Sequence, residues 1–335
     1  EGYNIILQGD IIKMVEMNLI QAVNSGLKCA MADDEKVVVL GEDVGPDGGV
    51  FRATEGLQKQ FGARRVMDTP LAESGIIGVS IGMAAAGLKP VPEIQFSGFL
   101  YMAFAQLVNH AEKIRNRSRG AFTCPIVVRT PYSGGIRALE HHSESMEAIY
   151  VHTPGLKVVI PSSPYDAKGL LISAIQGNDP VVFMEPSRLY RAVKEEVPEG
   201  FYTVPIGKAK IVKAGSQVTV ISWGSMLQQA KLALGHTTVD VELIDLRTLK
   251  PLDVDTIIQS VKKTGRCVIV QEAPRTGGMA SEIIALINEQ ALLNLKAPVA
   301  RVTGFDTAFP LYKLEDHYLP STERIINAIE ATANY

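Results

Sequence analysis

Short apolar runs rich in β-branched residues recur through the first half of the chain, separated by segments with helical spacing. Most of these runs do not alternate apolar with polar residues, which is typical of strands covered on both faces of a parallel sheet. The alternation of runs and helical segments predicts an α/β domain with right-handed crossovers. The strand signals are Val37–Leu40, Val91–Ile94, Pro125–Val128, Lys157–Ile160 and Val181–Phe183, and the helical patterns cover residues 14–32, 102–119 and 165–176.

A charged stretch punctuated by prolines interrupts this pattern between residues 184 and 207. We interpret it as the connection between two domains. Asp253 and Ser321 are the expected N-caps of two later helices. The predicted organisation is an α/β domain over residues 11–185, a linker over 186–206 and a smaller α/β domain over 207–335. In the second domain, strand signals lie at residues 218–221, 239–244, 267–270 and 299–302, and helix signals lie at 225–234, 254–263, 278–293 and from Ser321 onward.

Composition excludes several classes of protein. The chain has 335 residues with 33 basic and 36 acidic side chains, so no basic excess points to nucleic acid. Its three cysteines are isolated in sequence, which argues against a disulfide framework and against zinc. No apolar run reaches the roughly 18 residues of a membrane span, and no targeting segment is visible. We therefore expect a soluble protein without a membrane partner, cytoplasmic in a prokaryote or in the mitochondrial matrix of a eukaryote.

Polar residues, glycines and aromatics follow the predicted strands of the first domain. Ligands of open α/β sheets bind beyond the carboxyl ends of the strands. Each such residue taken alone is more often a helix cap or a turn former than a catalytic group. Together they predict a functional edge of the sheet. The segments concerned are residues 41–44, 68–75, 95–99 and 129–143.

Two standard motifs give weak signals. Gly78–Gly82 matches the G-x-S-x-G motif of serine hydrolases, with Ser80 as the nucleophile. A nucleophile elbow needs a strand that leads directly into the turn, whereas residues 71–87 have the pattern of a helix rich in small residues, so the hydrolase is the least favoured interpretation. The adjacent His141 and His142 lack the i, i+4 spacing of a helical metal pair.

A series of motifs resembles the β subunits of pyruvate, branched-chain 2-oxoacid and acetoin dehydrogenases. The motifs occur in order, at family-like spacing and over nearly the whole chain beyond about residue 11, so the series is more specific than any single motif. Residues 1–10 are atypical and carry no interpretation. The motifs are Gly41–Val44, Asp68–Glu73, Glu93–Phe96, His142–Ser145, Pro154–Val159, Asp166–Leu171, Asp245–Thr248, Lys263–Arg266 and Gln271–Pro274.

This resemblance implies a transketolase-type pyrimidine-binding domain and an α2β2 heterotetramer with thiamine diphosphate at the α–β interfaces. The α subunit would bind the diphosphate and Mg²⁺ through a GDG-type motif, which this chain lacks. Glu73 resembles the glutamate that hydrogen-bonds the cofactor's aminopyrimidine and favours the imino tautomer, which takes the proton from the thiazolium carbon. His142 matches the histidine near the reacting carbon that is implicated in transfer to the lipoyl group.

The resemblance also implies further binding positions. Phe99 matches the aromatic residue that stacks on the pyrimidine. Other cofactor-pocket positions correspond to Glu42, Leu71 and Gln95. Family members often bind K⁺ through main-chain oxygens, here those of Ile126, Val127, Ala174, Gly177 and Asp179. The second domain would assemble the tetramer and dock on the dihydrolipoyl acyltransferase core.

The implied activity is oxidative decarboxylation of a 2-oxoacid with acyl transfer to the lipoyl group. Residues 272–274, 276–282 and 304–307 resemble the branched-chain subgroup more closely, so the resemblance implies branched-chain 2-oxoacids as substrates, with pyruvate and acetoin as alternatives. An alternative of another class is a subunit that assembles the complex without working chemistry. The joint presence of Glu73, Phe99 and His142 disfavours it.

Overall fold

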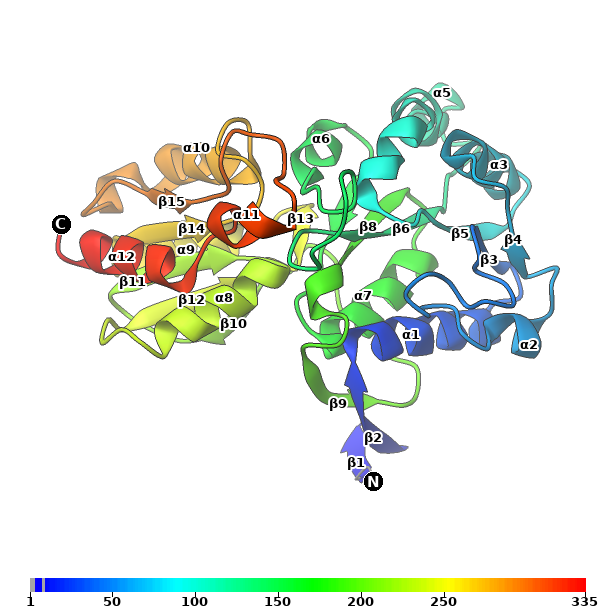
Figure 1. Ribbon diagram of the computed structural model, residues 1–335, viewed down its shortest axis with the longest axis horizontal. Helices are drawn as coiled ribbons and strands as arrows, with labels where there is room; N and C mark the ends of the chain where they lie inside the picture. Colours follow the sequence, from blue (N-terminus) through cyan, green and yellow to red (C-terminus); the bar gives the residue numbers. More distant parts are fainter. Residues whose placement is uncertain (1–3, 8–9) are drawn as a thin grey trace.

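The structure is a computed structural model that describes residues 4–7 and 10–335. It has two lobes side by side, and a short N-terminal hairpin projects from the first lobe (Figure 1). The strands are β1 (Asn4–Leu7), β2 (Asp10–Asn18), β3 (Val37–Gly41), β4 (Val66–Asp68), β5 (Lys89–Glu93), β6 (Val127–Tyr132), β7 (Lys157–Val159), β8 (Val181–Pro186), β9 (Lys194–Pro198), β10 (Lys210–Lys213), β11 (Val218–Ser222), β12 (Val241–Asp245), β13 (Thr248–Lys250), β14 (Cys267–Val270) and β15 (Ala300–Val302). The helices are α1 (Leu19–Asp33), α2 (Leu57–Phe61), α3 (Glu73–Ala85), α4 (Phe104–Gln106), α5 (Ile114–Arg117), α6 (Glu147–His152), α7 (Pro164–Gln176), α8 (Ser225–Leu234), α9 (Val254–Thr264), α10 (Met279–Ala291), α11 (Tyr312–Tyr318) and α12 (Thr322–Ala333), the 3-10 segments η1 (Ser97–Ala103), η3 (Ser187–Leu189) and η4 (Leu292–Asn294), and the π-helical segment η2 (Leu107–Ala111).

The first lobe is built on a seven-stranded sheet in the order β13-β7-β8-β6-β5-β3-β4. The six strands from β7 to β4 run parallel, and β13 joins the edge antiparallel. Helices α1 and α7 pack together below the sheet in the view of Figure 1, while α3, α5 and α6 lie above it. Every residue of β3, β6 and β8 is buried, as expected for strands covered on both faces. The α/β prediction for this lobe is confirmed.

The second lobe has a five-stranded sheet in the order β10-β12-β11-β14-β15. Four of its strands are parallel and β10 is antiparallel. Both predicted N-caps are confirmed, since Asp253 accepts a hydrogen bond from the Thr256 N–H at 3.3 Å and Ser321 accepts one from the Arg324 N–H at 3.2 Å. No helix in the described part of the chain is long and apolar enough to cross a membrane.

The helix predicted from residue 14 begins later than expected. Residues 14–18 belong to β2, which pairs antiparallel with β9. Helix α1 starts at Leu19 because Asn18 and Gln21 form a capping box, with reciprocal side chain to main chain hydrogen bonds of 2.9 Å. The apolar residues Met14 and Met17 fit a helical spacing by chance, so the prediction was wrong for these residues.

The long helix predicted over residues 102–119 is broken into η1, α4, η2 and α5. In the π-helical part, the Glu112 N–H donates to the Leu107 carbonyl five residues earlier, at 3.1 Å. A 3-10, an α and a π turn differ by one residue in hydrogen-bond spacing, so an apolar pattern does not separate them. Such breaks are frequent at functional sites.

The predicted linker is not a free connection. Within residues 186–206, β9 pairs with β2, and the Val204 N–H donates to the Gly169 carbonyl of α7 at 3.1 Å. The buried Lys168 ammonium donates to the carbonyl of Pro198 at 2.5 Å. Most of this segment is therefore packed on the first lobe.

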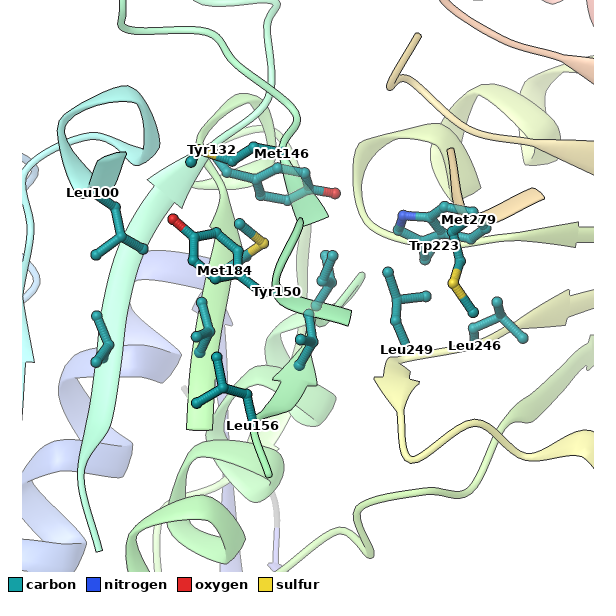
Figure 2. Close-up of a cluster of buried hydrophobic side chains, with 14 of the residues drawn as sticks. Leu100, Tyr132, Met146, Tyr150, Leu156, Met184, Trp223, Leu246, Leu249 and Met279 are labelled. Carbon is teal, nitrogen blue, oxygen red and sulfur yellow. The ribbon is translucent and has the colours of Figure 1, made fainter. Parts of the chain in front are cut away.

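The two lobes share one buried apolar cluster. Strand β13, from the predicted second domain, pairs with β7 of the first sheet. Figure 2 shows the cluster continuing from side chains on the first sheet to those of the second lobe. The labelled members are Leu100, Tyr132, Met146, Tyr150, Leu156, Met184, Trp223, Leu246, Leu249 and Met279. This continuity implies that the lobes hold a fixed arrangement.

A buried carboxyl group at the lobe junction makes the stability of the protein pH-dependent. Glu147 accepts a hydrogen bond from the Trp223 indole at 3.3 Å, but its Oε2 atom has no partner among the described residues. Burial, followed by the negative charge of Glu272, raises the pKa of Glu147 to about 7. The folded protein therefore holds this proton more tightly than the unfolded chain does. As a result, the free energy of unfolding falls as the pH rises from the ordinary pKa of a glutamate towards 7.

We expect Glu147→Gln to stabilise the protein above pH 7, by on the order of 1–3 kcal/mol, because the amide needs no proton to remain neutral. The advantage over the wild type should grow between about pH 5 and 7 and then level off. Thermal unfolding of both proteins at several pH values measures it. A stability difference that does not change with pH would contradict this assignment.

Candidate active site

Four neighbouring parallel strands deliver the predicted site residues to one edge of the first sheet. In the order β6-β5-β3-β4 these strands are adjacent, so their carboxyl ends lie at the same edge. The residues that follow these ends are Glu42 after β3, Leu71 and Glu73 after β4, Gln95 and Phe99 after β5, and His142 in the loop after β6. The structure therefore brings the six residues to one region.

An acidic group occupies one side of this region. Glu73 is the first residue of α3, its side chain is only 9% exposed, and it has no hydrogen-bond donor among the described residues. Burial, followed by the negative charges of Glu73 and Asp43, raises the pKa of Glu42. Gln95 donates a hydrogen bond of 3.3 Å to the Asp43 carboxylate. Glu42, Asp43 and Glu73 thus gather negative charge on one side of the region.

Gly41 allows the two central strands to approach closely at this edge. A Cβ atom at this position would lie 2.6 Å from the carbonyl oxygen of Glu93 on β5. No real side chain tolerates that distance, so the residue before Glu42 must be glycine. The short separation of β3 and β5 places Asp43 within reach of Gln95.

Aromatic rings and an imidazole form the other side of the region. The His142 ring centroid lies 4.2 Å from that of Phe96 and 5.2 Å from that of Phe99. His142 Nδ1 lies 2.6 Å from the carbonyl oxygen of Glu140. Because a carbonyl oxygen only accepts, Nδ1 carries the proton, and Nε2 is the nitrogen that remains for chemistry.

The loop that carries His142 folds back on η1. Ser97 donates to the Glu144 carbonyl at 2.9 Å. A Cβ atom at Gly98 would lie 2.3 Å from the carbonyl oxygen of His141, so glycine is required for this close contact. These contacts press the His142 loop against the segment that carries Phe99.

Leu71 differs from the other site residues because its side chain is 76% exposed. Val79 and Met102, on the neighbouring α3 and η1, are exposed apolar residues as well. Exposed apolar side chains that gather beside a site are typical of a surface that another chain covers. Leu71, Val79 and Met102 are therefore candidates for contact with a partner chain.

The residues implied in K⁺ binding lie at the opposite edge of the sheet, where β6 and β8 begin. The Ile126 carbonyl accepts from the Val181 N–H at 2.9 Å, and the Ala174 carbonyl accepts from the Gly177 N–H at 3.1 Å. The Asp179 carboxylate pairs with Arg115 and Lys157. A cation here would therefore use the second lone pairs of main-chain oxygens.

Ser80 and possible metal ligands were two other candidates for chemistry in this region. Ser80 is fully buried inside α3, and its hydroxyl donates to the Ile76 carbonyl at 2.8 Å, which excludes a nucleophile elbow. Within residues 4–7 and 10–335 there is no group of three or more His, Cys, Asp or Glu side chains able to hold a metal ion. Asp43 and Phe96 contact the site but were not singled out, although both lie in motifs at strand ends.

Comparison with known proteins agrees with this geometry. Residues 15–193 match the family described as transketolase, pyrimidine binding domain, and residues 207–325 match transketolase, C-terminal domain. The pyruvate dehydrogenase E1 component subunit beta of Acholeplasma laidlawii is 52% identical over 323 residues, which cover 96% of this chain and 99% of that protein. The protein of the same description from Staphylococcus epidermidis is 50% identical over 325 residues, covering 96% of this chain and all of that protein.

A solved structure supports the fold alone. The structure described as a split gene transketolase, inactive beta4 tetramer, has a TM-score of 0.76 and 20% identity, covering 95% of this chain and 99% of that one. The fold and the site thus define a chain of the transketolase-like, thiamine-diphosphate-dependent class. Within that class, the chain belongs to the family of 2-oxoacid dehydrogenase E1 β subunits.

The same relatives are named for pyruvate, so they do not support the branched-chain preference. Two of the three segments behind that expectation contact each other on the surface of the second lobe. The Thr276 hydroxyl donates to the Asp306 carboxylate at 2.7 Å. A contact of this kind serves the local structure and carries no information about the side chain of the substrate.

Proposed function

We propose that this chain is the β subunit of the decarboxylating component of a pyruvate dehydrogenase complex. Relatives that are 48–52% identical over 96% of the chain carry that description. The observation that carries the proposal is the arrangement at one sheet edge of a buried, unpaired Glu73 carboxylate and the Phe99–His142 ring pair. These residues also disfavour a subunit that only assembles the complex.

The residues present fit thiamine diphosphate. The Glu73 carboxylate accepts no hydrogen bond from the described residues, so it is free to bind a pyrimidine ring nitrogen. Phe99 offers an aromatic face, and Glu42 and Gln95 offer further polar groups. The cofactor supplies the electron sink for carbon–carbon bond cleavage. The chain's own residues would bind and orient the cofactor and exclude water from it.

His142 is the candidate for proton movement near the reacting atoms. Its Nδ1–H is held by the Glu140 carbonyl, so Nε2 can accept or deliver a proton. Packing on Phe96 and Phe99 fixes the ring plane. We assign to His142 a role in the reductive acylation of the lipoyl disulfide, in which the S–S bond breaks and accepts two electrons, one sulfur takes the acyl group, and His142 delivers a proton to the other sulfur.

The exposed apolar side chains beside the site, Leu71, Val79 and Met102, would be covered by an α subunit in an α2β2 heterotetramer. The sequence contains no GDG-type motif, so the diphosphate and Mg²⁺ would be held by that partner. K⁺ would bind the main-chain oxygens of Ile126, Val127, Ala174, Gly177 and Asp179 from within this chain. The product would be passed to a dihydrolipoyl acyltransferase core.

Reconstitution tests the proposal. The isolated chain is expected to bind thiamine diphosphate poorly and to decarboxylate no 2-oxoacid. Together with its α subunit it should act on pyruvate with a higher kcat/KM than on 3-methyl-2-oxobutanoate. Calorimetry of the single chain and a 2-oxoacid panel on the tetramer measure both.

Two outcomes would overturn the proposal. Tight Mg²⁺-dependent cofactor binding by the isolated chain would contradict the half-site. A tetramer that prefers the branched-chain substrate would restore the interpretation based on residues 272–274, 276–282 and 304–307.

Obligate interfaces of this kind usually bury more than about 2,000 Å², so co-purification of the two chains is the first step.

A further inference from the structure

The His142 loop, residues 133–146 between β6 and α6, has an unusual backbone. Three of its non-glycine residues have positive φ, namely Ser133 at 74°, Arg137 at 55° and His141 at 66°. Such conformations are costly for residues with a Cβ atom and persist only where the surroundings hold them. The loop therefore needs an external anchor.

A carboxylate from the second lobe contacts both ends of this loop. Glu272, which follows β14, is only 3% exposed. Its Oε1 atom accepts hydrogen bonds from the Gly134 N–H at 2.6 Å and from the Ser145 hydroxyl at 2.9 Å. Its Oε2 atom accepts from Ser225 of α8 at 3.0 Å. One oxygen thus joins residues near the start and the end of the loop.

Other groups of the second lobe support the same end of the loop. Glu315 accepts a hydrogen bond from the Gly135 N–H. Phe309 packs so closely on Gly134 that a Cβ atom there would lie 2.2 Å from its ring. Tyr132, which precedes the loop, and Met146, its last residue, belong to the buried cluster of Figure 2. The loop is thus built on both lobes.

We propose that Glu272 is a positioning residue for the acyl-transfer step, because it closes the loop and thereby holds His142 against Phe96 and Phe99. This inference rests on the function proposed for His142. It gives the second lobe a part in the active site in addition to the assembly role expected for it. Glu272 does not reach the reacting atoms itself and acts through the loop.

The assembled tetramer offers two independent measurements. Trypsin reports release of the loop by cleavage after Arg137, whose side chain is 69% exposed. The ratio of lipoyl-linked turnover to decarboxylation with an artificial electron acceptor reports the placement of His142. Loss of both loop hydrogen bonds in Glu272→Leu should raise the cleavage rate and lower the ratio, each by about 10-fold or more.

Three further variants sharpen the test. In Glu272→Gln the amide oxygen can still accept from Gly134 and Ser145 while the amide nitrogen donates to Ser225, so both readouts should stay within about 2-fold of the wild type. Ser145→Ala removes one of the two loop hydrogen bonds and should raise the cleavage rate and lower the activity ratio by about 3-fold each. This variant keeps the test possible if Glu272→Leu fails to assemble. The matched control is Glu242→Leu. Glu242 is a similarly buried carboxylate of the second lobe that pairs with Lys263, and in the described part of the chain it forms no hydrogen bond or ion pair with the loop.

Each outcome decides one question. If Glu272→Leu and Ser145→Ala match Glu242→Leu in cleavage rate and in the activity ratio, the positioning role is wrong and Glu272 only stabilises the junction. If Glu272→Gln is as impaired as Glu272→Leu, its charge rather than its loop bonds is needed, and the inference fails as well. A wild-type tetramer that acylates no lipoyl group would instead refute the proposed function. The trypsin result would still show whether Glu272 holds the loop in place.

Discussion

Glu73→Gln is expected to lower the activity of the reconstituted tetramer by about 10²-fold or more, equivalent to roughly 2.7 kcal/mol of activation barrier. The substitution keeps the size and shape of the side chain but removes the acid that would hold the cofactor's pyrimidine. Glu73 is buried at the start of α3 and has no partner in the described part of the chain, so no structural bond is lost. Stability should therefore change little.

The expected loss can be traced to one step. If Glu73 controls the protonation of the pyrimidine, the rate of hydrogen exchange at the thiazolium carbon of the bound cofactor should fall together with turnover. Glu55 provides the control, because it is an exposed carboxylate in the turn before α2, and Glu55→Gln should leave both rates unchanged. A Glu73→Gln tetramer that assembles normally and exchanges this proton at the wild-type rate would refute the role.

The strands of the parallel sheets could be predicted because both faces of each sheet are covered. Such strands leave continuous β-branched runs in the sequence, and β3, β8 and β14 lie where those runs are. The errors fall where a local signal was ambiguous. Residues 14–18 have apolar side chains at a helical spacing, but they pair with β9, a partner about 180 residues away in the chain that the local pattern cannot reveal.

The edge that carries the candidate site was predictable from strand ends alone. The role of each residue was not, since Glu73 and Glu42 are both acidic residues shortly after a strand, and only the family resemblance separated them. Their mutual influence emerges from the fold, where the charge of Glu73 contributes to the raised pKa of Glu42. A residue such as Glu272, which reaches the loop from more than a hundred positions away, has no local signal that sets it apart.

His142→Ala should lower lipoyl-linked turnover by about 10²–10⁴-fold, the usual contribution of an acid–base group. Decarboxylation measured with an artificial electron acceptor should fall much less, because that acceptor replaces the lipoyl disulfide as the oxidant and the reductive acylation step is bypassed. The physical reason is the orientation of the ring. Nδ1 is committed to the Glu140 carbonyl at 2.6 Å, so Nε2 is the atom whose loss the lipoyl assay detects.

The neighbouring histidine is the natural control for this prediction. His141 lies outside the ring cluster, and its exposed side chain lies 3.6 Å from the Glu144 carboxylate. Because its φ is 66°, asparagine is a better replacement than alanine, since asparagine tolerates left-handed backbone. His141→Asn should leave both assays near wild-type values. Equal and small effects of His142→Ala in the two assays would show that the His142 imidazole only fills the space beside Phe96 and Phe99, and the acyl-transfer step would then need another proton carrier.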